Sequence, residues 1–286
     1  AIRDRGGSLL TYAFRTRFCR MPYCPVDDIQ LYYEEAGSGE PLLLIHGLGS
    51  SGRDWVEQVD HFRDDYRVLR VDLRGHGRSG RSEGPYHIAQ FARDVAVLLR
   101  RLDADPAHVV GLSMGGMVAL QLADDAPRLV RSLVVANSVA DAELQTWGDV
   151  WFYLSRRTAV QVLGMRRVGE IIAEKLFVKP EQEELRHEFI ERWSRNDKQA
   201  YVWSVDAIMG WSVWDRLPSI TAPALIVSSD EDYTPVSEKE RMVDEMPRAE
   251  LAVVEDARHA LPVEKPDEFN AIVDNFLNDV SREDRE

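Results

Sequence analysis

Short apolar runs alternate with helical patterns along most of this 286-residue chain, and this alternation limits the folds open to it. Such runs are typical of strands buried in a sheet. The runs that we expect to be strands are residues 29–34, 42–45, 68–71, 109–111, 133–136, 225–227 and 251–254. Apolar residues recur at helical spacing in residues 88–102, 117–122 and 268–277. Strands that alternate with helices require right-handed crossovers, which predicts an α/β fold with a mostly parallel central sheet and helices on both faces.

One stretch, residues 139–217, interrupts the alternation because it carries helical patterns and no clear strand. Its position between two late strands predicts a helical cap, or lid, over the edge of the sheet. The core domain is then expected to comprise residues 25–138 and 218–280, followed by a disordered charged tail at 281–286. The insertion holds six of the seven tryptophans: Trp147, Trp151, Trp193, Trp203, Trp211 and Trp214.

The charge balance argues against polyanionic partners. Lys and Arg number 35 and Asp and Glu number 49, which gives a net charge of −14. An acidic surface repels phosphate, so we expect neither nucleic-acid nor membrane binding. The two cysteines, Cys19 and Cys24, are too few for a disulfide framework or a cysteine metal site. No apolar run approaches the ~18 residues that a transmembrane helix needs.

The N-terminal segment differs in composition from the rest. Five arginines stand against a single acid, Asp4, in the first 20 residues. Its apolar stretch is too short and interrupted for a secretory signal, while a transit peptide stays an alternative. We interpret residues 1–24 as an extension outside the core, with Met21 as the natural start, and expect a cytoplasmic protein.

The strongest chemical signal is Gly111-Leu-Ser113-Met-Gly115, which directly follows an expected strand and precedes a helical pattern. Ligands of such sheets bind outside the carboxyl ends of the strands, so Ser113 stands where function is expected. A nucleophile on a sharp strand-to-helix turn needs glycine two residues before and two after it, because side chains there would collide. We therefore predict that Ser113 is a nucleophile. The alternative is a glycine-rich turn without chemistry.

A serine nucleophile needs a base, and the base needs an orienting acid. Among seven histidines, only His259 lies after the last expected strand and before the final helix. Three carboxylates follow the preceding strand, and we choose Asp232 because its spacing lets the chain turn first. Asp230 is the second choice and Glu231 the third. The order serine, acid, histidine is one of the known orders for a catalytic triad.

An oxyanion hole needs two backbone N–H donors. One is expected from Met114, immediately after the nucleophile, and the other from Leu48 in the loop His46-Gly-Leu-Gly49. Because protein groups supply every role, neither a cofactor nor a metal is implied.

A second glycine-rich stretch, residues 75–80, fits a dinucleotide-binding fingerprint. Dinucleotide binding requires the glycine loop to open a helix, whereas residues 82–85 intervene before the helical pattern begins. The stretch also resembles a phosphate-binding loop, but Arg81 stands where that motif requires lysine. We interpret the stretch as a structural loop with Asp72 and Arg74 paired.

These motifs together resemble the α/β-hydrolase superfamily from about residue 29 to 278. Within it the chain is similar to bacterial carboxylesterases and 3-oxoadipate enol-lactonases, which share the Ser-Met-Gly-Gly elbow. The resemblance implies the roles given above to Ser113, Asp232 and His259, with oxyanion donors at Leu48 and Met114. Two positions depart from the family pattern, because many members have glycine at both. These positions are Arg258, directly before the histidine, and Ser229, three residues before the expected acid.

The sequence therefore predicts a serine hydrolase that cleaves small carboxylic esters through an acyl-enzyme. Enol-lactone hydrolysis, carbon–carbon bond hydrolysis, acyl transfer and a slow-turnover ligand receptor on the same fold stay open. We expect four tryptophans to line the substrate pocket, although they could instead join the cap to the core. These four are Trp147, Trp151, Trp211 and Trp214. The arginine pairs 156–157 and 166–167 could bind a carboxylate-bearing substrate or lie on solvated helix faces.

Overall fold

A computed structural model of the chain describes residues 22–144 and 146–283. Eight strands form one sheet in the order β1-β2-β4-β3-β5-β6-β7-β8. The first two pairings of this order are antiparallel and the remaining five are parallel. The strands are β1 (Tyr23–Val26), β2 (Ile29–Gly37), β3 (Glu40–Ile45), β4 (Tyr66–Val71), β5 (Ala107–Leu112), β6 (Val130–Ala136), β7 (Ala224–Ser229) and β8 (Ala249–Val254). The predicted α/β architecture is confirmed.

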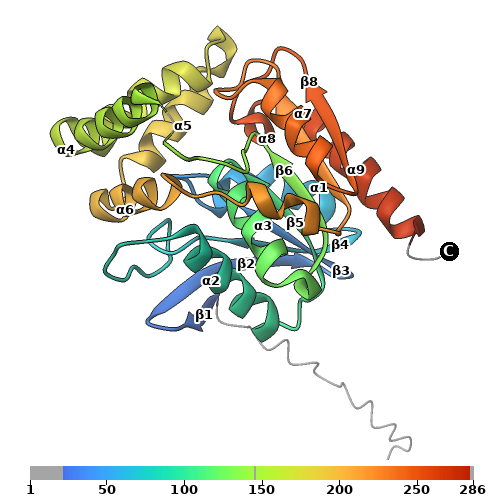
Figure 1. Cartoon of the computed structure of the whole chain (residues 1–286). Helices are drawn as coiled ribbons and strands as arrows, with labels where there is room; N and C mark the ends of the chain where they lie inside the picture. The colour runs from blue at the N-terminus through green and yellow to red at the C-terminus, as the bar shows by residue number, and fades with distance from the viewer. Residues whose placement is uncertain (1–21, 145, 284–286) are drawn as a thin grey trace, which may run out of the picture.

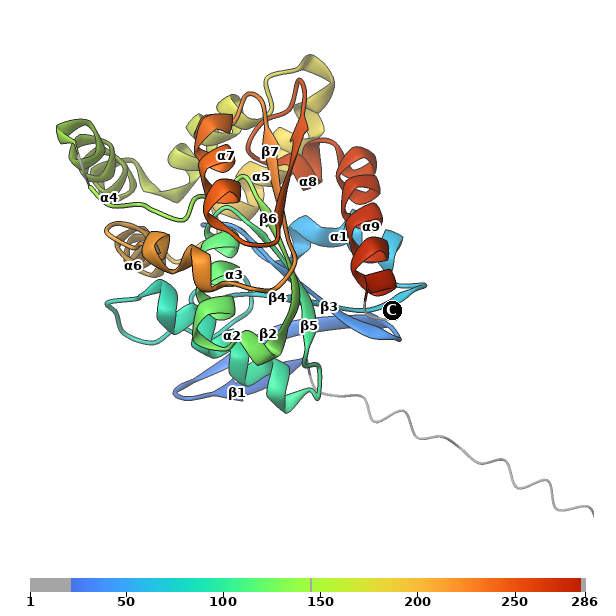
Figure 2. The same ribbon diagram turned by 45° about the vertical axis from the view of Figure 1, so that its right-hand side comes forward.

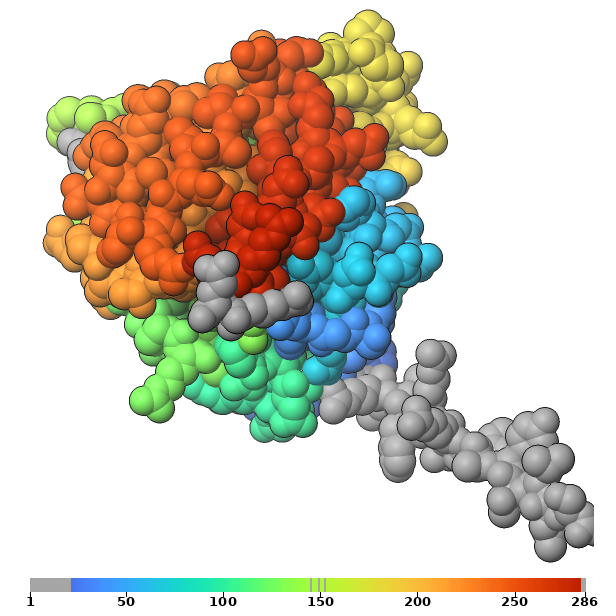
Figure 3. Space-filling view, turned by 90° about the vertical axis from the view of Figure 1, so that its right-hand side faces the viewer, coloured from blue at the N-terminus to red at the C-terminus, as the bar shows by residue number. Residues whose placement is uncertain are grey.

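Helices cover both faces of the sheet (Figure 2). One face packs against α2 (Ile88–Arg101), α3 (Met114–Asp125) and α7 (Val236–Glu245). The other face packs against α1 (Val56–Phe62) and α9 (Pro266–Glu283), which Figure 3 shows side by side.

The central strand β3 explains why an uninterrupted apolar run is required. Leu43 and Ile45 face the core that contains α2 and α3, while Leu42 and Leu44 face the core that contains α9. All four side chains are fully buried. Because successive strand residues point to opposite faces, both sets of side chains are buried in a strand covered on both sides, which favours apolar residues along its whole length.

Between β6 and β7 the chain forms three longer helices at one end of the sheet (Figure 1). These are α4 (Trp147–Leu176), α5 (Glu183–Trp193) and α6 (Lys198–Ile208). Gly164 interrupts α4 with φ 78° and ψ 168°. Apolar side chains of the three helices pack into a small core of their own. That this insertion acts as a lid stays a prediction.

The structure corrects both edges of the expected core. Tyr23 and Cys24 belong to β1, because they pair with Tyr32 and Leu31 of β2 and the Cys24 side chain is buried. At the other end, α9 extends to Glu283, so the first half of the expected tail is helical. Residues 1–21 of the N-terminal extension and residues 284–286 lie outside the described residues.

The glycine-rich loop after β4 has a structural anchor that differs from the expected one. Asp72 accepts hydrogen bonds from the backbone N–H groups of Gly52 (2.7 Å) and Arg78 (2.8 Å). Arg74 binds Asp94 of α2 instead of Asp72, through two hydrogen bonds of 2.8 and 2.9 Å. Both side chains of this pair are 1% exposed. The predicted pairing of Asp72 with Arg74 is therefore wrong, because the guanidinium turns toward the helix.

None of the helices within residues 22–144 and 146–283 is both long and apolar enough to cross a bilayer.

We expect Asp94→Ala to lower the free energy of unfolding by about 3 kcal/mol, because it leaves the buried Arg74 guanidinium without its main counterion. Urea denaturation measures this change. The exposed neighbour Arg93 provides the control, since Arg93→Ala should change stability by no more than ~0.5 kcal/mol. Equal unfolding midpoints for Asp94→Ala and the wild type would contradict the assignment.

Candidate active site

Ser113 occupies the sharp turn between β5 and α3, with φ 55° and ψ −120°. A Cβ atom on Gly111 would lie 2.2 Å from the Gly115 carbonyl oxygen, and one on Gly115 would lie 2.2 Å from the Ile45 carbonyl oxygen. Larger residues at either position would collide with backbone, so the helix reaches the sheet this closely only with glycine at both. The turn thereby holds the serine in a conformation that costs about 1–3 kcal/mol.

The backbone of Ser113 is fixed while its hydroxyl is free. Its N–H donates to the Ala136 carbonyl (2.9 Å), and its carbonyl accepts from Ser138 Oγ (2.7 Å). Ser113 Oγ has no hydrogen-bond partner among the described residues. A hydroxyl held in this way is available to a ligand.

Ser113 lines a cavity of about 240 Å³. The walls come from the loop after β3, the start of α3 and the helices α4, α5 and α6. Most of the lining is apolar, including Met117, Ile172, Leu176, Phe189, Trp193 and Ile208. His259 lines the same cavity. The structure therefore brings together the two residues that the sequence places 146 positions apart.

Asp232 and His259 are in direct contact, with Asp232 Oδ1 2.5 Å from His259 Nδ1. The Asp232 side chain is fully buried, and the imidazole is partly exposed. The ring of Tyr233 lies against the imidazole with a centroid separation of 4.4 Å. An acid bonded to Nδ1 directs Nε2 away from itself, which is the orientation a general base needs.

The second oxygen of Asp232 contacts a lysine that the sequence analysis did not single out. Lys239 of α7 is fully buried, and its Nζ lies 2.9 Å from Asp232 Oδ2. Thr234 Oγ1 donates to the same oxygen at 2.9 Å. Burial alone would raise the pKa of Asp232, but the hydrogen bond and charge of His259 and the charge of Lys239 hold that pKa well below its usual range.

The other candidate acids have different partners. Asp230 accepts a hydrogen bond from the Ala257 N–H at 3.2 Å and stabilises the turn below the histidine. Glu231 forms an ion pair with Arg258 on the surface. Of the three carboxylates after β7, the structure gives only Asp232 a contact with the imidazole.

The loop that carries His259 is anchored by Asn137 at the end of β6. Asn137 Nδ2 donates to the carbonyl oxygens of Arg258 and His259, both at 3.1 Å, and to Ser229 Oγ at 2.9 Å. Ser229 Oγ in turn donates to the Arg258 carbonyl at 2.8 Å. Asn137 has a positive φ of 43°, and no pattern in the sequence had indicated a role for this residue.

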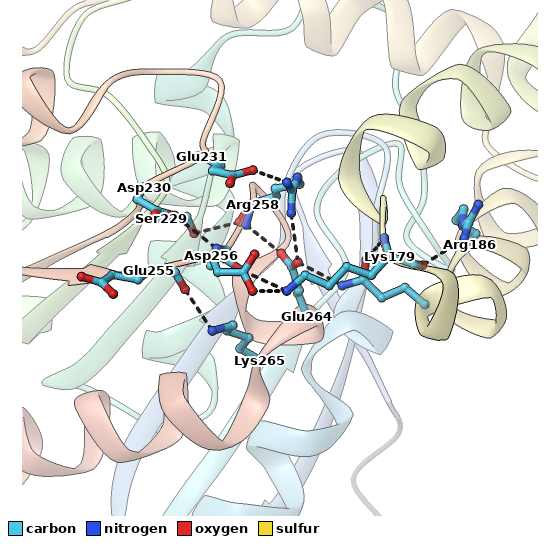
Figure 4. A network of polar contacts seen from close by, with 12 residues as sticks. Lys179, Arg186, Ser229, Asp230, Glu231, Glu255, Asp256, Arg258, Glu264 and Lys265 are labelled. Atoms are coloured by element: carbon cyan, nitrogen blue, oxygen red, sulfur yellow. Dashed lines mark hydrogen bonds and ion pairs between the residues drawn. The ribbon is translucent and has the colours of Figure 1, made fainter.

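Ser229 and Arg258, the two positions that depart from the family pattern, contact each other. Besides the bond between Ser229 and the Arg258 carbonyl, the Arg258 guanidinium lies between Glu231 and the buried Glu264 (Figure 4). The Arg258 N–H also donates to Glu264 Oε2 at 2.7 Å. Nearby, Lys179 of the insertion pairs with Asp256 (Figure 4). These polar contacts hold the histidine loop.

The loop after β3 is held by a buried histidine. Leu73 N–H donates to His46 Nε2 at 3.0 Å, so the proton of the neutral ring lies on Nδ1, which donates to the Gly47 carbonyl at 2.7 Å. Burial lowers the pKa of His46 to about 4, which keeps the ring neutral. Leu48 and Met114 both line the cavity, and Met114 as the first residue of α3 has no intrahelical acceptor for its N–H.

None of the four tryptophans expected in the pocket lines this cavity. Trp147 and Trp151 are 88% and 74% exposed. Trp211 donates to Gln121 Oε1 at 2.8 Å, and Trp214 lies under the Arg241 guanidinium at 4.7 Å, so both join the insertion to the core. The tryptophan that does line the cavity is Trp193 of α5. Helical spacing alone did not show which of the six would face inward.

Comparisons with known proteins identify the family and its relatives. A model described as the alpha/beta hydrolase family matches residues 42–272. The chain is 29% identical over 275 residues to a protein of Azorhizobium caulinodans named as a carbamate hydrolase, RutD, covering 92% of this chain and 100% of that one. It is 30% identical over 258 residues to 3-oxoadipate enol-lactonase 2 of Acinetobacter baylyi, covering 87% and 94%. The solved enol-lactonase of Burkholderia xenovorans LB400 has a TM-score of 0.83 at 26% identity, covering 90% and 100%.

We expect Asn137→Ala to loosen the histidine loop while leaving the fold intact, because the carbonyl groups of Arg258 and His259 lose the hydrogen bonds that the Asn137 amide donates to them. Native-state hydrogen exchange of the amides in residues 257–260 should become about tenfold faster. Asn278→Ala, on the exposed face of α9, is the matched control and should leave these rates unchanged. Unchanged exchange in Asn137→Ala would show that the loop is held by other contacts.

Proposed function

Because the chain belongs to the alpha/beta hydrolase family, we propose that it is a serine hydrolase that cleaves a carboxylic ester or lactone through Ser113, His259 and Asp232. The observation that carries this proposal is the contact between Asp232 and His259 at a cavity that also exposes Ser113 Oγ. A strained serine, a base and a buried orienting acid on three different loops are the elements of nucleophilic acyl transfer.

In the proposed reaction, Ser113 Oγ attacks the substrate carbonyl carbon and transfers its proton to His259 Nε2. Asp232 holds the imidazole through Nδ1 and stabilises the imidazolium that forms. The Leu48 and Met114 N–H groups donate to the oxyanion; in comparable sites, loss of one donor costs roughly 10²–10³ in rate. The tetrahedral intermediate collapses as the alcohol leaves with the proton from His259.

A second addition completes the cycle. Water gives a proton to His259 and attacks the acyl-serine, and the acid leaves as Ser113 recovers its proton. A lactone is a cyclic ester, so it opens by the same steps and keeps the alcohol attached. The names of the relatives in Acinetobacter and Burkholderia, both enol-lactonases, support including lactones in the substrate class.

The test is hydrolysis of p-nitrophenyl esters of increasing acyl length by the wild type and by Ser113→Ala. We expect multiple turnovers that fall by at least about 10³-fold in Ser113→Ala, since the nucleophile is removed. A fluorophosphonate probe should label the wild type at Ser113. The exposed Ser237 supplies the control, because Ser237→Ala should retain both activity and labelling. Turnover that survives in Ser113→Ala would overturn the proposal.

The pH dependence tests the role of Lys239. In the wild type, its charge offsets part of the charge of Asp232. Without it, the pKa of Asp232 would rise, because the carboxylate loses one of the charges that lower it, so Lys239→Met should move the acidic limb of the kcat/KM profile to higher pH by about one unit. A p-nitrophenyl ester assayed across the acidic limb measures this shift.

Lys265 is the control for that experiment, since its amine contacts the exposed Glu268 at 3.0 Å and not Asp232. Lys265→Met should retain the wild-type profile. An active Lys239→Met enzyme with an unshifted acidic limb would show that the lysine supports the fold without keeping Asp232 ionised.

A further inference from the structure

One cation stands out in the mostly apolar cavity. Arg156 of α4 lines it together with Ser113 and His259. The carboxylate in the lining, Asp54, is already paired with Arg192 at 2.7 Å. The positive charge of Arg156 therefore faces the cavity without compensation from Asp54.

The contacts of Arg156 leave most of its guanidinium free. Its Nε donates to the phenol oxygen of the buried Tyr201 at 2.8 Å. Among the described residues, no carboxylate lies within ion-pair distance of it, and its two terminal nitrogens have no hydrogen-bond partner. Anchoring Arg156 to Tyr201 requires only Nε, so the remaining N–H groups are available to a ligand.

The other arginines of α4 are all paired. Arg157 contacts Asp206 at 3.0 Å, Arg166 contacts Glu191 at 2.8 Å, and Arg167 contacts Glu170 at 2.6 Å. These three ion pairs do not involve the cavity lining. Asp and Glu outnumber Lys and Arg by 49 to 35 in this chain, so carboxylate partners are plentiful. Arg156 differs from the other arginines of α4 because it faces the cavity without such a partner among the described residues.

Arg156 also lies close to the reacting groups. Its charge acts on the Tyr233 phenol, and the Tyr233 ring packs on His259 at 4.4 Å. The guanidinium thus acts electrostatically on the tyrosine whose ring contacts the proposed base, and all three residues line the same cavity. A substrate that fills a cavity of about 240 Å³ and reaches Ser113 could also reach Arg156.

We propose that Arg156 binds a carboxylate of the substrate, so that the enzyme prefers esters or lactones carrying a carboxylate a short apolar spacer away from the scissile carbonyl. This inference rests on the proposed function. A guanidinium matches a carboxylate in a bidentate geometry, and an apolar environment strengthens the interaction. The apolar walls provide the surface for the spacer.

The experiment compares two esters of equal acyl length, mono(4-nitrophenyl) glutarate and its neutral methyl ester. The wild type should prefer the anionic ester. Arg156→Gln should lower the ratio of the two kcat/KM values by about 10- to 100-fold, the effect expected for losing hydrogen bonds to a charged group. Arg156→Lys should restore part of the preference, because lysine keeps the positive charge but cannot donate two parallel hydrogen bonds as a planar guanidinium does.

Arg157→Gln is the matched control. It removes the same charge from the adjacent residue, which lies on the surface against Asp206. It should keep the wild-type ratio, which separates a specific contact from the general field of the insertion. A circular dichroism spectrum and a thermal unfolding midpoint close to those of the wild type serve as the check that Arg156→Gln folds.

Failure of this inference is distinct from failure of the proposed function. If the wild type cleaves both esters through Ser113 and the ratio is the same in Arg156→Gln, the carboxylate site is overturned and the hydrolase stands. If the wild type cleaves neither ester, the proposed hydrolysis of such esters fails. Calorimetric titration with glutarate then decides the site, because binding that is weaker in Arg156→Gln than in Arg157→Gln supports it and equal binding overturns it.

Discussion

The close approach of α3 to the sheet is the constraint on which the rest of the site depends. The carbonyl oxygens of Ile45 and Gly115 lie only 2.2 Å from the positions that Cβ atoms on Gly115 and Gly111 would take. With the helix this close, the chain has room for only one residue between strand and helix, and that residue takes a positive φ. Ser113 is that residue, and the fold places its hydroxyl at the carboxyl edge of the sheet.

Around this serine, burial and hydrogen bonding keep one acid ionised and one histidine neutral. Asp232 stays ionised because His259 and Lys239 occupy its two oxygens. His46 stays neutral because it is buried and receives a backbone N–H on Nε2. The imidazole of His259 thus lies against an ionised carboxylate at the cavity, whereas the neutral imidazole of His46 holds the neighbouring loop.

Much of this arrangement could be predicted from residue patterns because it is local. The seven expected strands all lie within observed ones, which are longer by one to three residues at an end, since strands buried on both faces favour apolar runs. β1 was missed because only four residues form it, and Pro25 weakens its strand pattern. α7 was missed because seven of its ten residues are charged or polar, and its inward side includes Lys239.

The chain by itself determined the α/β class, the serine turn and the order of serine, acid and histidine, because these depend on periodicity and on residues adjacent in sequence. Only the tertiary structure showed Asp232 in contact with His259, added Asn137 and Lys239 to the site, and placed Trp193 and Arg156, but none of the four expected tryptophans, in the cavity lining. Those contacts join segments up to 122 residues apart. The physical reason is that helical spacing shows which residues share a face, while packing against other elements decides whether that face meets the cavity or the solvent.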